Sequence, residues 1–290
     1  MPELPEVELV VRDLVKELNH ERIERVEISD VVIDSKLEGK EAIVKTLDVP
    51  TFISEMEGMR IESITRRSKY IYMTLSKNGE TYLLASHLGM TGAWFVGNSL
   101  DDVTEEKFRR HIHAVFTLDD GRLLIYSDIR RFGELRLLKE EADYPPLLQM
   151  APEPFDEGAE DYFIARVSEP KWLEKPIKQA IMNGTVISGC GNIYATEALF
   201  KQKIHPKRAC RRISEQRKRA LFQEIVAILN ESIERGGSSI SDYRNVNGES
   251  GTMQNVHQMY NKKVCPTCGS ATKQIQIQNR TSTYCPQCQK

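Results

Sequence analysis

Apolar residues near the amino-terminal end of the chain recur at the spacing of an α-helix. This helix is predicted to begin at Pro5, because proline is favoured in the first helical turn. Glu3, Glu6 and Glu8 lie around the start, where the helix dipole favours negative charge. The predicted apolar face consists of Val7, Val10, Val11, Leu14 and Leu18.

Between about residues 22 and 140 the apolar spacing changes to the alternation of β-strands. Turn-forming sequences, KNGE, LDDG and RFGE, lie between the alternating segments. Strand sets that close over one another in this way predict a β-sandwich or flattened barrel. The segments that alternate are ERVEISDVVID, KYIYMTL, TYLLASHL, HAVFTL and RLLIYSDI.

The second half of the chain is predicted to be helical. Residues 161–236 have helical spacing, in which Gly184 is a predicted helix stop and Asn192 and Ser214 are predicted caps. Residues 237–262 are rich in Ser, Asn and Gly, which predicts a flexible loop.

The length of 290 residues and these patterns predict an α+β protein with more than one domain. An N-terminal β-sandwich domain with its helix is expected over 1–141, followed by a Pro- and acid-rich linker over 142–160. A helical domain is expected over 161–262, including the loop 237–262, and a hairpin over 263–290.

The formal net charge of −2 hides an uneven distribution. Residues 161–290 contain 20 Lys+Arg and 10 Asp+Glu, whereas residues 1–160 contain 20 and 32, so the halves carry +10 and −12. This asymmetry makes the basic half the candidate for binding a polyanion. The alternative is that the basic run RRACRRISEQRKR is only a solvated helix start.

The chain contains no run of about 18 apolar residues, so no membrane span is expected. Its opening, MPELPEVE, is acidic and lacks the basic, apolar and cleavage-site pattern of a secretory signal. We therefore expect a cytoplasmic protein whose cysteines are reduced.

Four of the six cysteines form two C-x2-C pairs separated by 16 residues, a spacing typical of a structural zinc site. A hairpin between the pairs would bring the second pair back to the first, with Asn279 and Arg280 at its turn. Four thiolates leave no open coordination position, so one Zn²⁺ would hold the shape of the hairpin. The predicted ligands are Cys265, Cys268, Cys285 and Cys288.

The amino terminus is a second candidate for chemistry. Initiator Met is normally removed before proline, which would leave Pro2 with a secondary amine whose pKa is near 8. An amine beside a carboxyl group, here Glu3, can attack a sugar carbon and form a Schiff base. The alternative is that Pro-Glu-Leu-Pro-Glu only stiffens and caps the first helix.

The opening PELPEVE resembles that of the formamidopyrimidine-DNA glycosylases, and the resemblance continues in the same order over residues 2–290. One of the matching segments, SGCGNIYATEALF, resembles the helix–two-turn–helix motif of this family. The other segments that carry the resemblance are RRSKY, HLGMTG, DIRRFG and NRTSTYCPQCQK.

The resemblance implies a bifunctional glycosylase/lyase of base-excision repair, which acts as a monomer on double-stranded DNA that contains an oxidised purine. Pro2 resembles the nucleophile, Glu3 the acid that assists sugar ring opening, and Glu6 a supporting carboxylate. Lys69 resembles the residue that holds a phosphate next to the lesion. Further phosphate contacts are implied for His87, Asn192, Tyr260 and Arg280.

An enzyme that acts on a base must rotate it out of the helix and fill the gap that remains. By resemblance, Met90 and Phe132 fill this gap and Arg130 pairs with the orphaned base, which implies 8-oxoguanine or a formamidopyrimidine opposite cytosine. Ile129 stands where the family usually has proline, and Cys190 where it usually has an aliphatic residue.

These differences leave room for a paralogue with another lesion preference. An endonuclease VIII-like enzyme for oxidised pyrimidines is the nearest alternative, but its opening more typically resembles PEGPEI, so Leu4 favours the purine enzyme. A non-catalytic protein that binds damaged DNA and a zinc-ribbon protein-interaction factor are the remaining alternatives.

Overall fold

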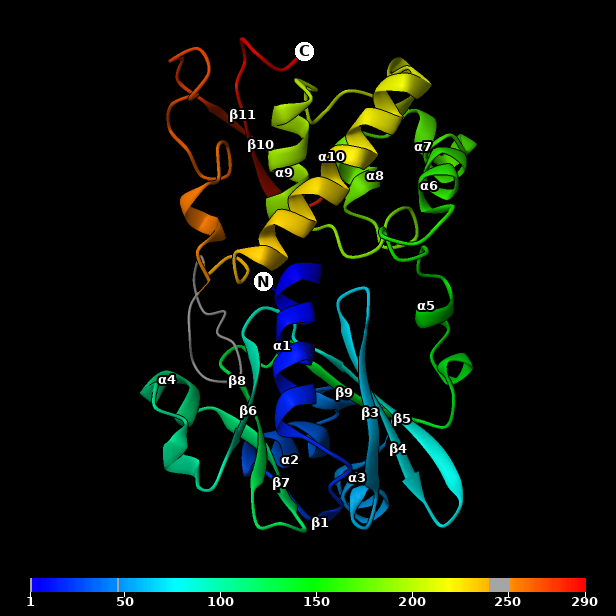
Figure 1. The fold of residues 1–290 in the computed structure, drawn as a ribbon, viewed down its shortest axis with the longest axis vertical. Coiled ribbons are helices and arrows are strands. Elements are labelled where there is room, and N and C mark those ends of the chain that lie inside the picture. Colours follow the sequence, from blue (N-terminus) through cyan, green and yellow to red (C-terminus); the bar gives the residue numbers. More distant parts are fainter. Residues whose placement is uncertain (1, 46, 240–250) are drawn as a thin grey trace. The chain divides into compact units, whose positions relative to one another are not determined.

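The computed structural model describes residues 2–45, 47–239 and 251–290. Their contacts divide the chain into two compact units. Figure 1 labels helices and strands of both. Unit 1 contains Pro2, Glu6–Leu148 and the described residues of Gly236–Gly251. Unit 2 contains Glu3–Pro5, Gln149–Arg235 and Thr252–Lys290.

Two sheets form the framework of unit 1, and together with the predicted N-terminal helix they confirm the expected sandwich. The four-stranded sheet has the order β1-β7-β8-β6 and the five-stranded sheet the order β2-β9-β5-β4-β3. All of the neighbours are antiparallel except β2 and β9, which are parallel. The strands are β1 (Ile23–Ile28), β2 (Ile43–Lys45), β3 (Arg60–Arg67), β4 (Tyr70–Lys77), β5 (Glu80–His87), β6 (Gly92–Gly97), β7 (Ile112–Leu118), β8 (Leu123–Asp128) and β9 (Glu134–Leu138).

The apolar face of helix α1 (Leu4–Glu17) contributes to the main core of unit 1. All five positions predicted for this face are buried, and they join side chains from both sheets, including Phe116 of β7 and Leu84 of β5. Helical spacing in the sequence therefore identified the side of α1 that loses contact with water, which is the main source of its stability.

Helices α2 (Asp30–Leu37) and α3 (Val49–Met56) lie among the strands between residues 22 and 140, so the prediction of a strand through ERVEISDVVID was wrong beyond Ile28. Asp48 caps α3, because its carboxylate accepts a hydrogen bond from the Thr51 backbone N–H at 2.9 Å. The remaining short elements of unit 1 are η1 (Leu100–Asp102), α4 (Glu106–Arg109), η2 (Glu141–Asp143) and α5 (Pro145–Leu148).

Helices dominate unit 2, as the second half of the sequence predicts. Ser214 is the N-cap of the long helix α10, and its hydroxyl accepts from the Arg217 N–H, which confirms the predicted cap. The core of this unit also includes Leu4 from the amino-terminal segment. The helices are α6 (Ala159–Val167), α7 (Pro170–Leu173), α8 (Ile177–Ile181), α9 (Asn192–Lys201), η3 (Cys210–Arg212), α10 (Glu215–Glu234) and η4 (Met253–Asn255).

Strands β10 (Lys273–Ile277) and β11 (Arg280–Tyr284) form the predicted hairpin between the cysteine pairs. Its two-residue turn is Gln278–Asn279, one position earlier than predicted, and both residues have positive φ, as a type I′ turn requires. Arg280 is consequently the first residue of β11.

The predicted flexible loop 237–262 is only partly covered, because residues 240–250 lie outside the described residues. In the covered part, η4 forms a short turn and the Gly251 N–H donates to the Ser239 hydroxyl at 2.9 Å. None of the helices in the described ranges combines the length and apolar character needed to cross a bilayer.

Candidate functional site

The carboxylate of Glu3 lies at the amino-terminal end of α9, within unit 2. It accepts hydrogen bonds from the backbone N–H groups of Gly191 at 2.7 Å and Ile193 at 2.9 Å, and Glu3 is only 1 % exposed. A helix start offers unpaired N–H donors and a favourable dipole, so a carboxylate is well matched to this position.

This arrangement corrects the prediction that Asn192 caps α9. The N-cap residue is Gly191, and the donors at the helix start are bound by Glu3, a residue 188 positions earlier in the chain. Asn192 instead begins the helix, and its side-chain amide donates to the Thr281 carbonyl at 3.2 Å. That bond joins α9 to the hairpin strand β11.

The two glycines of SGCGN make this close approach possible. The Leu4 N–H donates to the Gly189 carbonyl at 3.1 Å, and a Cβ on Gly189 would lie 2.4 Å from the Leu4 side chain. A Cβ on Gly191 would lie 2.4 Å from the carboxyl carbon of Glu3. Any side chain at either position would displace the amino-terminal segment.

Lys178 is a charged residue near Glu3 that the sequence analysis missed. It is fully buried in α8, and its ammonium donates to the Thr196 hydroxyl at 2.7 Å. Burial lowers the pKa of Lys178 to about 8, although the charges of Glu3 and Cys190 act in the opposite direction. The available signal was a lysine among the apolar residues Ile177, Ala180 and Ile181 of the segment IKQAI.

Three predicted DNA-binding residues, Asn192, Tyr260 and Arg280, lie near one another in unit 2. Burial raises the pKa of Tyr260 and the charge of Glu3 raises it further, whereas Asn192 and Arg280 lower it. Glu3, Asn192 and Arg280 therefore all lie close enough to Tyr260 to shift its pKa. Asn192 comes from helix α9, Tyr260 from a loop and Arg280 from the hairpin.

Glu197 positions the loop that carries Tyr260, and the sequence analysis did not identify it. Its buried carboxylate accepts from three consecutive backbone N–H groups, of Gln258 at 2.7 Å, Met259 at 2.9 Å and Tyr260 at 2.6 Å. Charge-assisted bonds to a buried carboxylate are strong. Glu197 thereby fixes this segment against α9.

In unit 1, Lys69 and His87 lie at facing ends of the paired strands β4 and β5. Lys69 is in the turn before β4, and His87 pairs with Tyr70, whose ring centroid is 4.9 Å away. Burial lowers the pKa of His87 to about 4, and the charge of Lys69 lowers it further. The imidazole is therefore neutral at pH 7.

The hydrogen bonding of His87 also defines which of its nitrogens can donate. The Gly89 N–H donates to His87 Nδ1 at 3.0 Å, so Nδ1 is an acceptor and the proton of the neutral ring lies on Nε2. His87 Nε2 and the Lys69 ammonium are consequently two donors suited to an anion.

The other predicted carboxylate, Glu6, is 1 % exposed and accepts from the Ser238 N–H at 2.8 Å, within unit 1. It links the first turn of α1 to the residues just before the uncovered segment. Pro2 is buried and lies one peptide bond before Glu3, so their Cα atoms are about 3.8 Å apart.

Met90, Arg130 and Phe132 lie on two neighbouring loops of unit 1. Met90 is half-buried, while Arg130 is exposed and Phe132 is 56 % exposed, with the guanidinium 4.8 Å from the ring centroid. Exposure of so large an apolar side chain as Phe132 is typical of a contact surface and does not fit the alternative of an ordinary core residue.

A buried pair, Thr91 and Asp128, joins these two loops. The Thr91 hydroxyl donates to Asp128 Oδ1 at 2.6 Å and accepts from the Arg130 N–H at 2.8 Å. Asp128 also accepts from the N–H groups of Arg130 at 3.1 Å and Gly133 at 2.7 Å. The loops additionally touch through their backbones, since a Cβ on Gly89 would lie 2.5 Å from the Phe132 carbonyl carbon.

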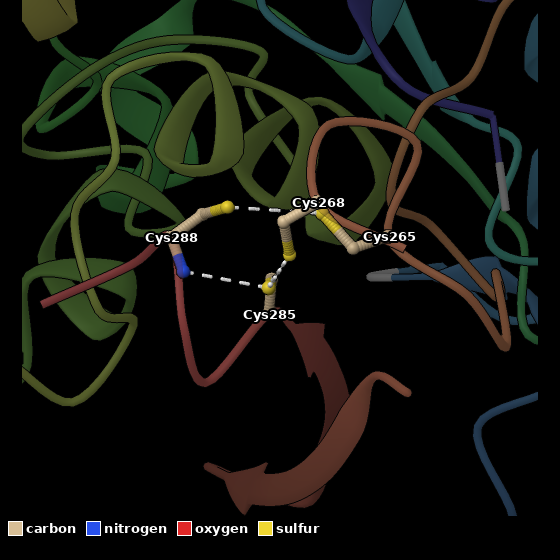
Figure 2. A group of neighbouring side chains, drawn as sticks. All are labelled: Cys265, Cys268, Cys285 and Cys288. Atoms are coloured by element: carbon tan, nitrogen blue, oxygen red, sulfur yellow. Dashed lines mark hydrogen bonds between the residues drawn. The ribbon is translucent and has the colours of Figure 1, made fainter. Parts of the chain in front are cut away.

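The four cysteines of the ribbon form a cluster that is positioned to hold a metal ion (Figure 2). Their sulfurs all lie within 4.8 Å of one another, with 3.9 Å between Cys265 and Cys288 and 3.5 Å between Cys268 and Cys285. Tetrahedral zinc with Zn–S bonds of about 2.3 Å separates its sulfurs by about 3.8 Å. The spacing of the thiols therefore fits a structural zinc.

Family models match most of the chain. The formamidopyrimidine-DNA glycosylase N-terminal domain matches residues 1–135, and the H2TH domain of the same family matches residues 150–244.

Individual proteins are similar over the full length. The formamidopyrimidine-DNA glycosylase of Acinetobacter baylyi is 38 % identical, over 100 % of this chain and 98 % of the relative. A Lactococcus lactis variant bound to Fapy-dG containing DNA is 32 % identical, with a TM-score of 0.82 and 99 % of each chain covered. The wild-type L. lactis protein bound to an oxidized pyrimidine containing DNA is 31 % identical, with a TM-score of 0.81 and the same coverage. By these matches in sequence and fold, the chain belongs to the formamidopyrimidine-DNA glycosylase family.

Proposed function

We propose that this chain removes oxidised purines from duplex DNA and then cleaves the strand at the abasic site. Its relatives are named formamidopyrimidine-DNA glycosylases, and the similar L. lactis structures hold damaged DNA. DNA with a damaged base is therefore its partner and base-excision repair its role.

The observation that carries the proposed mechanism is the buried carboxylate of Glu3, bound by two N–H groups of a helix start. Because these bonds hold Glu3 in place, Glu3 restrains Pro2, the residue covalently bonded to it. Once Met1 is removed, Pro2 has a secondary amine beside a fixed carboxyl group. Such positioning of a nucleophile is a large part of enzymatic catalysis.

The reaction begins when the Pro2 nitrogen attacks C1′ of the deoxyribose. The bond from C1′ to the base breaks, the base leaves with its bonding electron pair and takes up a proton, and the sugar ring opens with assistance from Glu3. The result is an iminium ion between Pro2 and C1′. Two eliminations then release the 3′ and the 5′ phosphate, and water frees the enzyme.

Phosphate contacts are assigned to the donors around each candidate site. His87 Nε2 and Lys69 offer one pair in unit 1, and Asn192, Tyr260 and Arg280 form the cluster in unit 2. Glu6 supports the catalytic terminus by anchoring α1 to Ser238.

Met90, Arg130 and Phe132 are proposed to enter the duplex and replace the rotated base. Arginine offers donors in a planar fork and cytosine offers acceptors, which supports recognition of a cytosine opposite the lesion. The exposure of Arg130 and Phe132 supports this role.

One structural Zn²⁺ is proposed to be held by Cys265, Cys268, Cys285 and Cys288. The ion would supply folding energy to the hairpin, because four thiolates leave no position for substrate. The placement of Arg280, the first residue of β11, would depend on this ion.

Borohydride trapping tests the mechanism, since borohydride reduces an iminium ion to a stable amine. With an 8-oxoguanine:cytosine duplex, the processed protein should become covalently bound to DNA. A form with a non-removable residue before Pro2 should not be trapped, and Pro2→Gly should be trapped more slowly. Equal trapping of the blocked form would exclude Pro2 as the nucleophile. No trapping of any form would leave a non-catalytic damage-binding protein.

A second substrate class is supported by the L. lactis protein solved with an oxidized pyrimidine containing DNA. Initial rates on duplexes with 8-oxoguanine and with thymine glycol would rank the two classes. We expect the purine to be the better substrate, and a faster rate on thymine glycol would favour the endonuclease VIII-like alternative.

A further inference from the structure

Unit 2 contains a cationic hollow that the proposed reaction does not use. It has a volume of about 410 Å³ and is lined by His205, Lys207, Arg208, Ala209, Arg212 and Lys290. We call it the 205–212 hollow. Most of its lining comes from the segment that joins α9 to α10, and Lys290 follows the ribbon hairpin.

Backbone and side-chain bonds tie the two sides of this hollow together. The His205 N–H donates to the Lys290 carbonyl at 3.1 Å, and the Gln289 side chain donates to the Ile204 carbonyl at 2.9 Å. The His205 ring also packs edge-on against Tyr284, with centroids 4.5 Å apart. The hollow is therefore a built part of the fold, which combines the helical segment with the ribbon.

The donors around the hollow are arranged by local hydrogen bonds. The Lys207 N–H donates to His205 Nδ1 at 3.1 Å, so the proton of the neutral ring lies on Nε2. Arg208 Nε donates to the Arg212 carbonyl at 3.1 Å, which leaves its terminal nitrogens to other partners.

No side-chain carboxylate in the described ranges pairs with the three basic side chains Lys207, Arg208 and Arg212 of this hollow. Other basic residues nearby do form such pairs. Arg211 pairs with Glu174, and the other pairs are Lys201 with Glu224 and Arg219 with Glu160, Asp161 and Glu215. Three unpaired cations around one hollow repel each other, and an anion would relieve that repulsion.

The chemistry of the lining favours a phosphate group. Each of the two guanidinium groups can bind two oxygens of a phosphate, and the lysine adds a point charge. The phosphate-rich ligand of this family is DNA, so the inference rests on the proposed DNA-binding function.

The position of the hollow distinguishes it from the contacts near the lesion. Asn192 is at the first residue of α9, whereas the hollow follows its last residue, Lys201. Ten helical residues span about 15 Å, so the two phosphate-binding regions lie at opposite ends of α9.

We propose that the 205–212 hollow is a second phosphate-binding site, which engages a DNA segment other than the one held at the start of α9. A protein with two such sites can contact a second duplex before it leaves the first. It would then pass directly between DNA segments, in addition to dissociating into solution.

Stopped-flow dissociation from a labelled undamaged duplex tests this proposal. At fixed ionic strength, rising concentrations of unlabelled duplex should accelerate dissociation of the wild-type protein several-fold. Lys207→Gln with Arg212→Gln should dissociate at one rate whatever the competitor concentration. Both side chains are exposed and make no side-chain hydrogen bond with the described residues, so this variant should fold. Arg208→Gln, added to the pair, should give the same result.

A matched control is Lys16→Gln with Lys40→Gln in unit 1, which removes the same charge from exposed residues that pair with Asp13 and Glu38. This control should keep the wild-type acceleration. A wild-type rate independent of competitor, or an acceleration that survives in the hollow variants, would overturn the proposal.

Two further measurements separate the possible outcomes. Single-turnover excision of 8-oxoguanine should be equal in the wild type, the hollow variants and the control; loss of excision in all of them would reject the proposed function and leave the dissociation test intact. Calorimetry with tripolyphosphate identifies the other source of phosphate. If tripolyphosphate binds only when the hollow is intact while competitor DNA has no effect, the site serves a free polyphosphate and the DNA proposal is wrong.

Discussion

Removal of one hydroxyl, by Thr91→Val, should disturb the two loops that are proposed to fill the gap in the duplex. Valine keeps the shape of threonine but cannot donate to Asp128 or accept from Arg130. Asp128 is fully buried and Thr91 is 4 % exposed, so water cannot replace the lost partner without rearrangement.

The expected loss follows from the type of bond. A hydrogen bond to a charged group contributes about 1.5–3 kcal/mol. The Arg130 N–H retains its second acceptor, Asp128, at 3.1 Å, so it is not left unpaired. We therefore expect a total cost of about 2 kcal/mol, divided between global stability and the local position of the loops. If the local share dominates, excision should fall by about 30-fold, since about 1.4 kcal/mol corresponds to a factor of ten.

The assay compares two single-turnover reactions. Excision of 8-oxoguanine opposite cytosine requires the base to be rotated out and the gap filled. Cleavage at a preformed abasic site depends less on these two steps, because no base has to be rotated out. Thr91→Val should slow the first reaction much more than the second. Thr91→Ser, which keeps the hydroxyl, should restore excision to within a few-fold of the wild type. Equal losses in both reactions, or normal excision despite a lowered melting temperature, would refute the assigned positioning role.

Four further predictions concern buried charges and the ribbon. Because the pKa of His87 is lowered to about 4, the unfolded chain takes up a proton that the native protein does not between about pH 6.5 and 4; stability should fall as the pH drops through this window, and less steeply in His87→Gln by denaturant titration. The pKa of Lys178 is lowered to about 8, so this group should contribute a rise of about 3 kcal/mol in stability between pH 8 and 10.5, measured as the difference between the pH profiles of the wild type and Lys178→Met. Glu197→Gln replaces one of the two accepting oxygens by an amide donor and removes the charge that strengthens all three bonds, so limited proteolysis should cut near Tyr260 faster, and unchanged cleavage would show that other contacts hold this segment. Cys288→Ser should release zinc to a chromophoric chelator and weaken duplex binding at least tenfold, and full affinity without the metal would contradict its structural role.

Local patterns in the sequence predicted those features whose causes are local. The face of α1 follows from the repeat of apolar positions, and α10 begins at Ser214 because a serine hydroxyl binds the free N–H groups of a helix start. Cysteines with two residues between them place both sulfurs on one side of a turn, so the spacing alone indicated the metal cluster.

Short elements were predicted less well, because packing decides between competing local preferences. The sequence from Ser29 continues an alternating strand pattern with a run of three β-branched residues, Val31, Val32 and Ile33, yet α2 forms there and buries Val32 in the main core. A helix of eight residues has little stability of its own, and its pattern is too short to separate the two periods.

Only the tertiary structure decided which distant residues complete the candidate site. Glu3 binds the start of α9 in place of Asn192, and Thr91 joins Asp128 across 37 positions. Each of these contacts satisfies a buried polar group, and which partner satisfies it depends on how the chain folds back on itself. The sequence determines which groups need a partner, whereas the packed fold determines which residue provides it.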